Sequence, residues 1–295
     1  MKNEQDLKEL VKEKYGQIAQ QSKAQNESSC CGSTCCGGGV DYTIFSDSYD
    51  NLSGYEPDAD LGLGCGLPTE FAKINEGDTV VDLGSGAGND CFVARAITGP
   101  SGKVIGIDMT DAMIEKARQN AQKLGYNNVE FHLGDIEDMP LPSHIADVVV
   151  SNCVLNLVPD KRKALSEVLR VLKPGGHFSI SDVVLRGAIP DQLKESAEMY
   201  AGCVAGALPE GEYLGIIHDL GFENVTIQKR KPIIVPDDIL SRHLSAEEIT
   251  AYKASGTGIF SITVSASKPA PVHNEAPSDK SALKAACCGT NSTCC

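Results

Sequence analysis

The sequence is short of positive charge and contains no basic block. It has 26 Lys and Arg residues against 40 Asp and Glu residues, for a formal net charge of −14, and no run of five or more Lys or Arg residues. Binding of nucleic acid needs a basic surface that neutralises phosphates. The composition therefore argues against a nucleic acid as partner.

Long apolar runs are also missing. The first residues, MKNEQDLKEL, lack the apolar stretch of a signal peptide, and no uninterrupted apolar run approaches the ~20 residues of a membrane span. The apolar content of 41% is nevertheless ordinary for a globular protein. We expect a soluble, monomeric protein of the cytoplasm with no membrane partner.

Cysteine is abundant and unevenly placed. A reducing cytosol keeps thiols available for metals, catalysis or redox chemistry, so disulfides are not the default interpretation. Eight of the 12 cysteines lie in two clusters near the ends, and four lie singly between them, which implies two different roles. The clusters are Cys30, Cys31, Cys35 and Cys36, then Cys287, Cys288, Cys294 and Cys295; the single thiols are Cys65, Cys91, Cys153 and Cys203.

Composition and periodicity divide the chain into four segments. Residues 1–40 carry an amphipathic helix, expected over 6–21, and a flexible Cys-rich stretch. Residues 41–185 form the main domain, residues 186–267 a smaller α+β region that covers the substrate, and residues 268–295 a flexible Cys-rich tail.

Short apolar runs alternate with helical segments from residue 79 onward, which is typical of βαβ units and a mainly parallel sheet. The predicted fold class is α/β, a Rossmann-like doubly wound sheet. The two late strands either complete the edge of this sheet or form a small appended domain. We expect strands at 79–83, 103–108, 129–133, 146–151, 177–184, 224–229 and 258–266, helices at 90–97, 111–124, 161–172, 191–205 and 209–220, and a turn at 173–176.

The segment TVVDLGSGAG, residues 79–88, reads as a buried strand that runs into a glycine-rich turn. Gly84, Gly86 and Gly88 allow the backbone to approach a ligand closely, because a Cβ atom there would obstruct it. The spacing departs from the Gly-x-Gly-x-x-Gly pattern of dinucleotide sites. A nucleoside-like ligand is therefore expected, and a nicotinamide cofactor is the weaker alternative.

Three carboxylates accompany this turn. Asp108 ends the second strand, where it accepts hydrogen bonds from ribose hydroxyls or begins the next helix. Asp135 follows the third strand beside apolar Ile136, as an adenine ligand or a turn residue. Asp82 lies inside the first strand, where a carboxylate needs a partner in the loop or the ligand.

Together with the sequence KPGG at 173–176, these features resemble the class I methyltransferase family over about residues 60–185. The resemblance implies a Rossmann-like fold that binds S-adenosylmethionine. The residues expected to bind it are Asp82, Gly84, Ser85, Gly86, Gly88, Asp108, Met109, Asp135, Ile136 and Asn152.

Three thiols are placed to meet at the acceptor side of this cleft. Cys153 follows the fourth strand, Cys65 lies in the glycine-rich loop LGLGCGL, and Cys203 lies in the segment after the fifth strand. Each alone is often a small buried apolar residue, and we accept that interpretation for Cys91. As a trio beside the cleft they favour shared ligation of one soft atom.

Thiolate sulfur selects soft, thiophilic centres rather than Mg²⁺ or Ca²⁺. Zinc would require a fourth ligand, and no histidine neighbours these cysteines in the sequence. Trivalent arsenic needs only three sulfurs and keeps a lone pair that can attack a methyl group. No proton leaves arsenic, so no general base is required, and none is evident at the fourth-strand end.

The motifs LGLGCG, DLGSGAGND, GIDMT, SNCVLNLVPDK and YAGCV resemble the arsenite methyltransferases over about residues 60–206. The resemblance implies arsenite and methylated arsenicals as ligands, with Cys153 and Cys203 as arsenic-binding thiols and Cys65 as a third, ligating or redox-active cysteine. It also implies thioredoxin or glutathione as the source of reducing equivalents. The family has one further N-terminal thiol, and four residues are candidates for it: Cys30, Cys31, Cys35 and Cys36.

The terminal clusters either capture arsenite on a mobile tether or form a clip for zinc or another soft metal. The N-terminal cluster favours capture, and the tail leaves both open. Two other functions stay open for the whole chain. One is a class I methyltransferase for a quinone, sterol or other carbon acceptor, with structural cysteines. The other is a thiol-rich metal-buffering or metal-sensing protein with a vestigial nucleoside fold.

Overall fold

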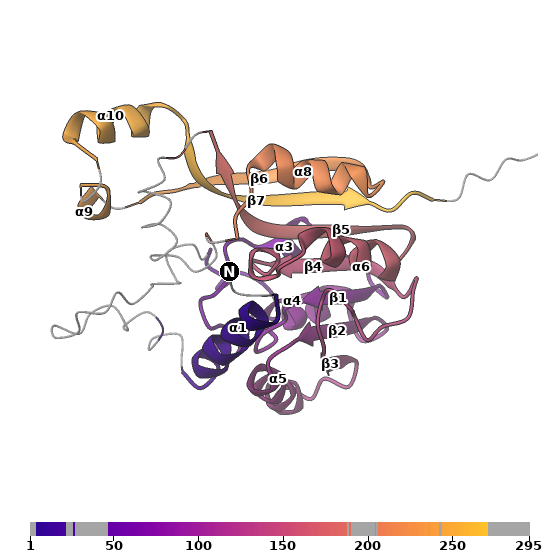
Figure 1. Cartoon of the computed structure of the whole chain (residues 1–295). Coiled ribbons are helices and arrows are strands. Elements are labelled where there is room, and N and C mark those ends of the chain that lie inside the picture. Colours follow the sequence, from indigo (N-terminus) through magenta and orange to yellow (C-terminus); the bar gives the residue numbers. More distant parts are fainter. Residues whose placement is uncertain are drawn as a thin grey trace, which may run out of the picture.

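The computed structural model describes residues 4–21, 26, 47–187, 189, 204, 206–235, 237–241 and 244–270. Its centre is one seven-stranded sheet in the order β3-β2-β1-β4-β5-β7-β6, around which the helices are arranged (Figure 1). The strands are β1 (Thr79–Leu83), β2 (Lys103–Asp108), β3 (Val129–Leu133), β4 (Ala146–Asn152), β5 (Leu172–Arg186), β6 (Glu223–Ile233) and β7 (Gly258–Ser267).

The first five strands are parallel, and β7 and β6 complete the edge beside β5. Strand β7 pairs antiparallel with β5 over its whole length, from Gly258 opposite Arg186 to Ser267 opposite His177. Strand β6 pairs antiparallel with β7 in turn. The late strands therefore belong to the main sheet, which resolves the alternative that the sequence left open.

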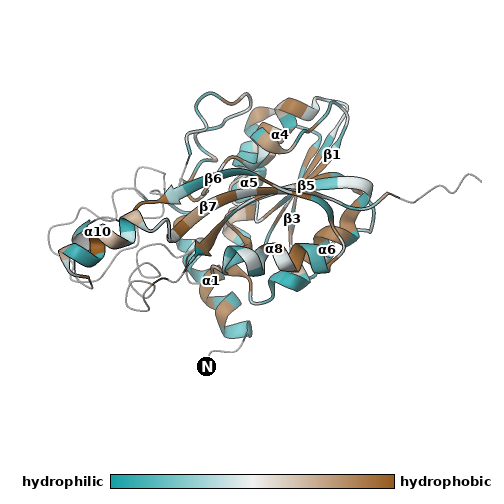
Figure 2. Cartoon of the chain, turned by 90° about the horizontal axis from the view of Figure 1, so that it is seen from above, coloured by the Kyte–Doolittle hydropathy of each residue, from teal (hydrophilic) through white to brown (hydrophobic). Residues whose placement is uncertain are grey.

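The helices cover both faces of the sheet. Figure 2 shows α4 on one side and α6 and α8 on the other, and Figure 1 shows α9 and α10 at the far ends of β6 and β7. The helices are α1 (Glu4–Ile18), α3 (Pro68–Phe71), α4 (Asn89–Thr98), α5 (Asp111–Leu124), α6 (Lys161–Val171), α8 (Glu210–Asp219), α9 (Asp237–Leu240) and α10 (Ala246–Ala254), with a short 3-10 helix η2 (Leu155–Leu157).

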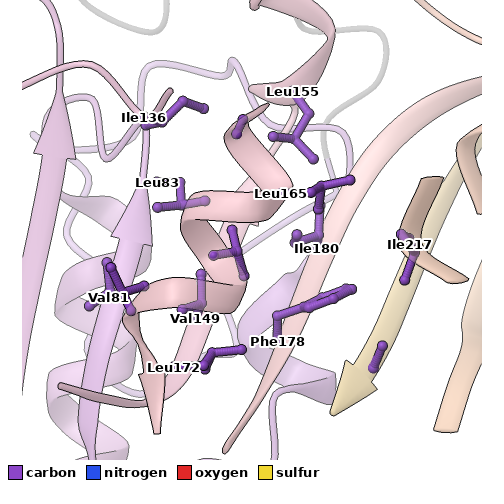
Figure 3. Close-up of a cluster of buried hydrophobic side chains, with 14 of the residues drawn as sticks. Val81, Leu83, Ile136, Val149, Leu155, Leu165, Leu172, Phe178, Ile180 and Ile217 are labelled. Atoms are coloured by element: carbon purple, nitrogen blue, oxygen red, sulfur yellow. The ribbon is translucent and has the colours of Figure 1, made fainter. Parts of the chain in front are cut away.

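Alternate residues of the central strands fill two separate cores. Val81 and Leu83 point to the face covered by α6 and α8, where Figure 3 shows them with Leu165 and Phe178. Val80 points to the opposite face, which α3, α4 and α5 cover. Both faces of a parallel sheet are buried, so its strands are continuous apolar runs, as in TVVDL. This packing holds the carboxyl ends of β1, β2 and β4 in fixed register.

The predicted α/β fold class is confirmed, and the predicted strands 79–83, 103–108 and 129–133 have the observed bounds. The prediction of a separate turn at 173–176 is wrong. These residues lie within β5, where the pairing with β4 jumps from Leu172 to His177 around an irregularity. The predicted helix 191–205 lies almost entirely outside the described residues. Within the described ranges, no helix has the length and apolarity to cross a membrane.

Candidate active site

A cleft lies at the carboxyl ends of β1, β2 and β4, with about 1070 Å³ of space that includes solvent at its open side. Open α/β sheets bind ligands at this edge, where the order of strands reverses. Here the reversal falls between β1 and β4, which are neighbours in space although two strands lie between them in sequence. Helix α1 closes the opposite side, because Lys8, Val11 and Tyr15 line the cleft.

The glycine-rich turn forms the floor of the cleft. Gly84 has a φ of +63°, and a Cβ atom there would lie 2.5 Å from the side chain of Val154. Gly86 has a φ of +51° and faces the cleft, and its backbone N–H donates to Asp108 Oδ2 at 3.0 Å. Gly88 lies outside the cleft lining, where an added Cβ atom would meet the ring of Phe92 at 2.8 Å. The third glycine thus serves close packing of α4.

Nine of the ten residues expected to bind the nucleoside line this cleft: Asp82, Gly84, Ser85, Gly86, Asp108, Met109, Asp135, Ile136 and Asn152. Asp108 accepts from the backbone N–H of Thr110 at 2.8 Å as well as from Gly86, which fixes its carboxyl group at the end of β2. The hydroxyl of Ser85 and the amide oxygen of Asn89 are buried without a hydrogen-bond partner. These two atoms are available to a polar ligand.

The cleft is strongly acidic. Burial raises the pKa of Asp108, and burial together with the charge of Asp90 raises that of Asp82 well above its ordinary value. Burial also raises the pKa of Asp90 to about 6, against hydrogen bonds from Asn152 and Tyr49 that lower it. Several buried carboxylates in one cleft repel one another, so the site favours a ligand with positive charge.

Asp135 has a partner that the sequence did not predict. Lys8 of α1 forms ion pairs with Asp135, at 2.5 Å, and with Glu137. Lys116 of α5 holds the end of α1 through the carbonyl of Ala19, at 3.1 Å. The N-terminal helix is therefore docked over the cleft and contacts the residue expected to bind adenine.

Cys153 lines the cleft directly after the end of β4 and has a strained backbone. Its φ is +63°, a conformation that non-glycine residues adopt rarely and that concentrates at functional sites. Its backbone N–H donates to the carbonyl of Ser181 at 2.8 Å, which ties it to β5. Cys153 is 4% exposed and lines the cleft.

Cys65 lies in the same buried cluster as Cys153, together with Val204. Its side chain is fully buried, and its carbonyl accepts from the hydroxyl of Ser261 at 2.5 Å. Cys203 lies outside the described residues, but its neighbour Val204 is 1% exposed in this cluster. Two of the three expected thiols therefore belong to one buried cluster, and the structure does not describe the third. The terminal thiols Cys30, Cys31, Cys35, Cys36, Cys287, Cys288, Cys294 and Cys295 also lie outside the described residues.

Cys91, assigned to the core from the sequence, is fully buried in the opposite core. Its thiol donates to Asp82 Oδ2 at 3.2 Å, and burial raises its pKa well above the ordinary value. A thiol that stays protonated is a poor ligand for a metalloid. Cys91 therefore lies in the core, where the sequence placed it, with Asp82 as its polar partner.

Tyr49, Asp90 and Lys8 line the cleft but were not predicted to do so. The hydroxyl of Tyr49 donates to Asp90 at 2.9 Å, and both residues contact Asn152. Asp90 is the second residue of α4, two positions after Gly88, so its place at the start of this helix was the available signal. No pattern in the sequence connects Tyr49 or Lys8 with the turn, because both come from distant segments.

Comparison with known proteins agrees with this geometry. Residues 74–234 match the family model of a methyltransferase domain. The chain is 39% identical over 281 residues to the arsenite methyltransferase of Halobacterium salinarum. This alignment covers 90% of this chain and 68% of that protein. It is 34% identical over 245 residues to the arsenite methyltransferase of Aquipseudomonas alcaligenes, in an alignment that covers 81% of this chain and 68% of that protein.

A solved structure extends the comparison to three dimensions. The X-ray structure of an arsenic(III) S-adenosylmethionine methyltransferase from Chlamydomonas reinhardtii aligns with a TM-score of 0.58 at 35% identity. The alignment covers 71% of this chain and 68% of that one. The fold, the methyltransferase domain and the relatives lead to one conclusion: this chain belongs to the arsenite methyltransferase family, within the class I methyltransferases.

Proposed function

We propose that this enzyme transfers methyl groups from S-adenosylmethionine to trivalent arsenic held by its own thiolates, in arsenic detoxification. The observation that carries the proposal is the position of Cys153. This residue lines the cleft and also packs in one buried cluster with Cys65. An atom bound to this sulfur lies at the border of the cleft. Methyl transfer requires that proximity.

The residues of the cleft suit S-adenosylmethionine. Asp108 would hold the ribose hydroxyls, Asp135 and Ile136 the adenine, and Asp82 the ammonium group of the methionine part. The buried hydroxyl of Ser85 and the surrounding carboxylates suit a polar ligand with a cationic centre. When bound, S-adenosylmethionine supplies an electrophilic methyl group, which the lone pair of arsenic accepts.

The thiolates hold the acceptor and exclude water from it. Arsenite binds three thiols as its three hydroxyl groups leave as water, and Cys65, Cys153 and Cys203 are the thiols that we assign. Cys65 is fully buried and Cys153 nearly so, which protects arsenic–sulfur bonds from hydrolysis. Among the described residues that line the cleft there is no histidine, and the reaction needs no base because no proton leaves arsenic.

Methylation oxidises arsenic from the trivalent to the pentavalent state. A thiol reductant, thioredoxin or glutathione, would return two electrons and regenerate a trivalent methylated arsenical for release or a further cycle. We assign capture of arsenite to the vicinal thiols Cys30, Cys31, Cys35 and Cys36, since thiol pairs tethered to the enzyme raise the local concentration of the arsenite that they bind.

Arsenic speciation tests the proposal directly. The purified enzyme is incubated with arsenite, S-adenosylmethionine and a thiol reductant, and the products are separated and identified by their arsenic content. We expect methylated arsenicals from the unchanged enzyme and none from Cys153→Ser. The matched control is Cys91→Ser, which should retain the activity because its hydroxyl can still donate to Asp82. Methylation of a quinone or sterol with equal activity in both variants would instead favour a carbon acceptor.

A further inference from the structure

We infer that Asn152 is a positioning residue that holds the loop of Cys65 against the end of β4 and so sets the distance between the two described thiols. The inference rests on the proposed function and deepens it. Sequence reasoning assigned Asn152 to the cofactor, and the residue does line the cleft. Its hydrogen bonds, however, are directed mainly to the thiol-bearing loop.

The amide of Asn152 is bonded on both sides to this loop. Its oxygen accepts from the backbone N–H groups of Cys65, at 2.9 Å, and of Gly66, at 3.3 Å. Its nitrogen donates to the carbonyl of Gly66 at 2.8 Å. Asn152 immediately precedes Cys153, so one side chain joins the backbones that carry the two thiols.

The loop is shaped to receive this amide. A Cβ atom on Gly64 would lie 2.6 Å from Asn152 Nδ2, so any larger residue there would push the amide away. The carbonyl of Cys65 is held independently by the hydroxyl of Ser261. The backbone of Cys65 is thus fixed at its N–H by Asn152 and at its carbonyl by β7.

The orientation of the amide is fixed from the cleft side. Asn152 Nδ2 also donates to the hydroxyl of Tyr49 at 2.6 Å and to Asp90 Oδ2 at 3.2 Å. These acceptors determine which end of the amide faces the Cys65 N–H. Outer residues of this kind orient ligands around a bound metal and cost roughly 10- to 100-fold in affinity when they are removed.

Phenylarsine oxide isolates the thiol pair, because its single organic substituent leaves two positions for sulfur. Two arsenic–sulfur bonds form as two hydroxyl groups of the hydrated arsenical leave with the two thiol protons as water. The test uses the 295-residue chain with its eight terminal cysteines and Cys203 replaced by serine. Binding then reports the pair Cys65 and Cys153.

In this background we expect Asn152→Ala to weaken phenylarsine oxide binding by roughly 10- to 100-fold. Binding of S-adenosylmethionine, measured by calorimetry, should change by less than about threefold. Gly64→Ala should reproduce the loss with Asn152 itself unchanged, because the added Cβ atom displaces the Asn152 amide. This second variant keeps the inference testable if the first does not fold. In the unaltered chain, Asn152→Ala should raise KM for arsenite and leave KM for S-adenosylmethionine nearly unchanged.

Two serines provide a matched comparison. Ser261→Ala removes the bond to the Cys65 carbonyl and should weaken arsenical binding severalfold, whereas Ser179→Ala removes a buried bond to Pro68 and should not. Loss of cofactor affinity with unchanged arsenical affinity in Asn152→Ala would overturn the inference. If Cys65→Ser itself bound phenylarsine oxide as well as its parent, the proposed thiol site would fail, and the inference with it.

Discussion

Replacing Asp90 by Asn should stabilise the protein in the absence of its cofactor, by an amount that grows with pH. Burial raises the pKa of this carboxyl from 3.8 to about 6, so its folded state holds the proton more tightly than its unfolded state. At neutral pH the ionised carboxylate therefore costs about 3 kcal/mol, from a shift of about two units at 1.36 kcal/mol each. Asn removes this cost.

The direction follows from proton linkage. Between the unfolded and the folded pKa the native state binds more protons, so unfolding free energy falls as pH rises through about 4 to 6 and the full cost is present above that window. We expect the gain of Asp90→Asn over the unchanged protein to increase by about 1.4 kcal/mol between about pH 5 and about pH 8. The hydrogen bonds from Tyr49 and Asn152 are already included in the folded pKa of about 6, so their loss in the variant adds only an offset that does not change with pH.

The assay is urea unfolding of both proteins at the two pH values, with thiols kept reduced. Asp219→Asn serves as control, because this surface carboxylate pairs with Arg162 and is 64% exposed; its effect should stay within about 0.5 kcal/mol at both pH values. Saturating S-adenosylmethionine should reverse the advantage, since its cationic centre gains from the charge of Asp90. A stability difference between Asp90→Asn and the parent that is independent of pH would refute the reasoning.

Three further outcomes are expected. Cys65→Ser and Cys153→Ser should each lose arsenite methylation by at least about 100-fold while S-adenosylmethionine binds as before, and calorimetry with activity assays checks this. Lys8→Met should raise KM for S-adenosylmethionine several-fold and increase proteolysis within α1, because it breaks the ion pairs to Asp135 and Glu137; unchanged values would remove α1 from the site. Truncation after Lys268 should leave turnover at saturating arsenite largely intact, and a near-complete loss would contradict an accessory role for the tail.

The sheet and its glycine-rich turn were predictable because local sequence determines them. The buried strand TVVDL, its turn and the carboxylates at strand ends follow one another in the chain, and parallel strands bring their carboxyl ends to one edge. The irregularity in β5 was not predictable, since KPGG is equally typical of a turn. Strand β4 pairs with Leu172 and His177 on either side of these residues, and Lys268 forms backbone hydrogen bonds with Gly175 and Gly176.

The remaining parts of the site depend on contacts between distant segments. An amphipathic pattern predicts that α1 buries one face, but not that Lys8 of this helix reaches Asp135 across 127 positions of the chain. Asn152 could be placed at the end of a strand from its neighbours. Its partner Cys65 lies 87 residues away, and nothing local to either residue indicates the hydrogen bond.

X-ray absorption at the arsenic edge tests the thiolate site most directly. The sample is the enzyme with all eight terminal cysteines replaced by serine, loaded with one equivalent of arsenite. We predict arsenic surrounded by three sulfur atoms, and by two sulfurs and one oxygen in Cys153→Ser and in Cys65→Ser. An arsenic environment that keeps three sulfurs in both variants, or that contains oxygen alone in the parent, would contradict the site.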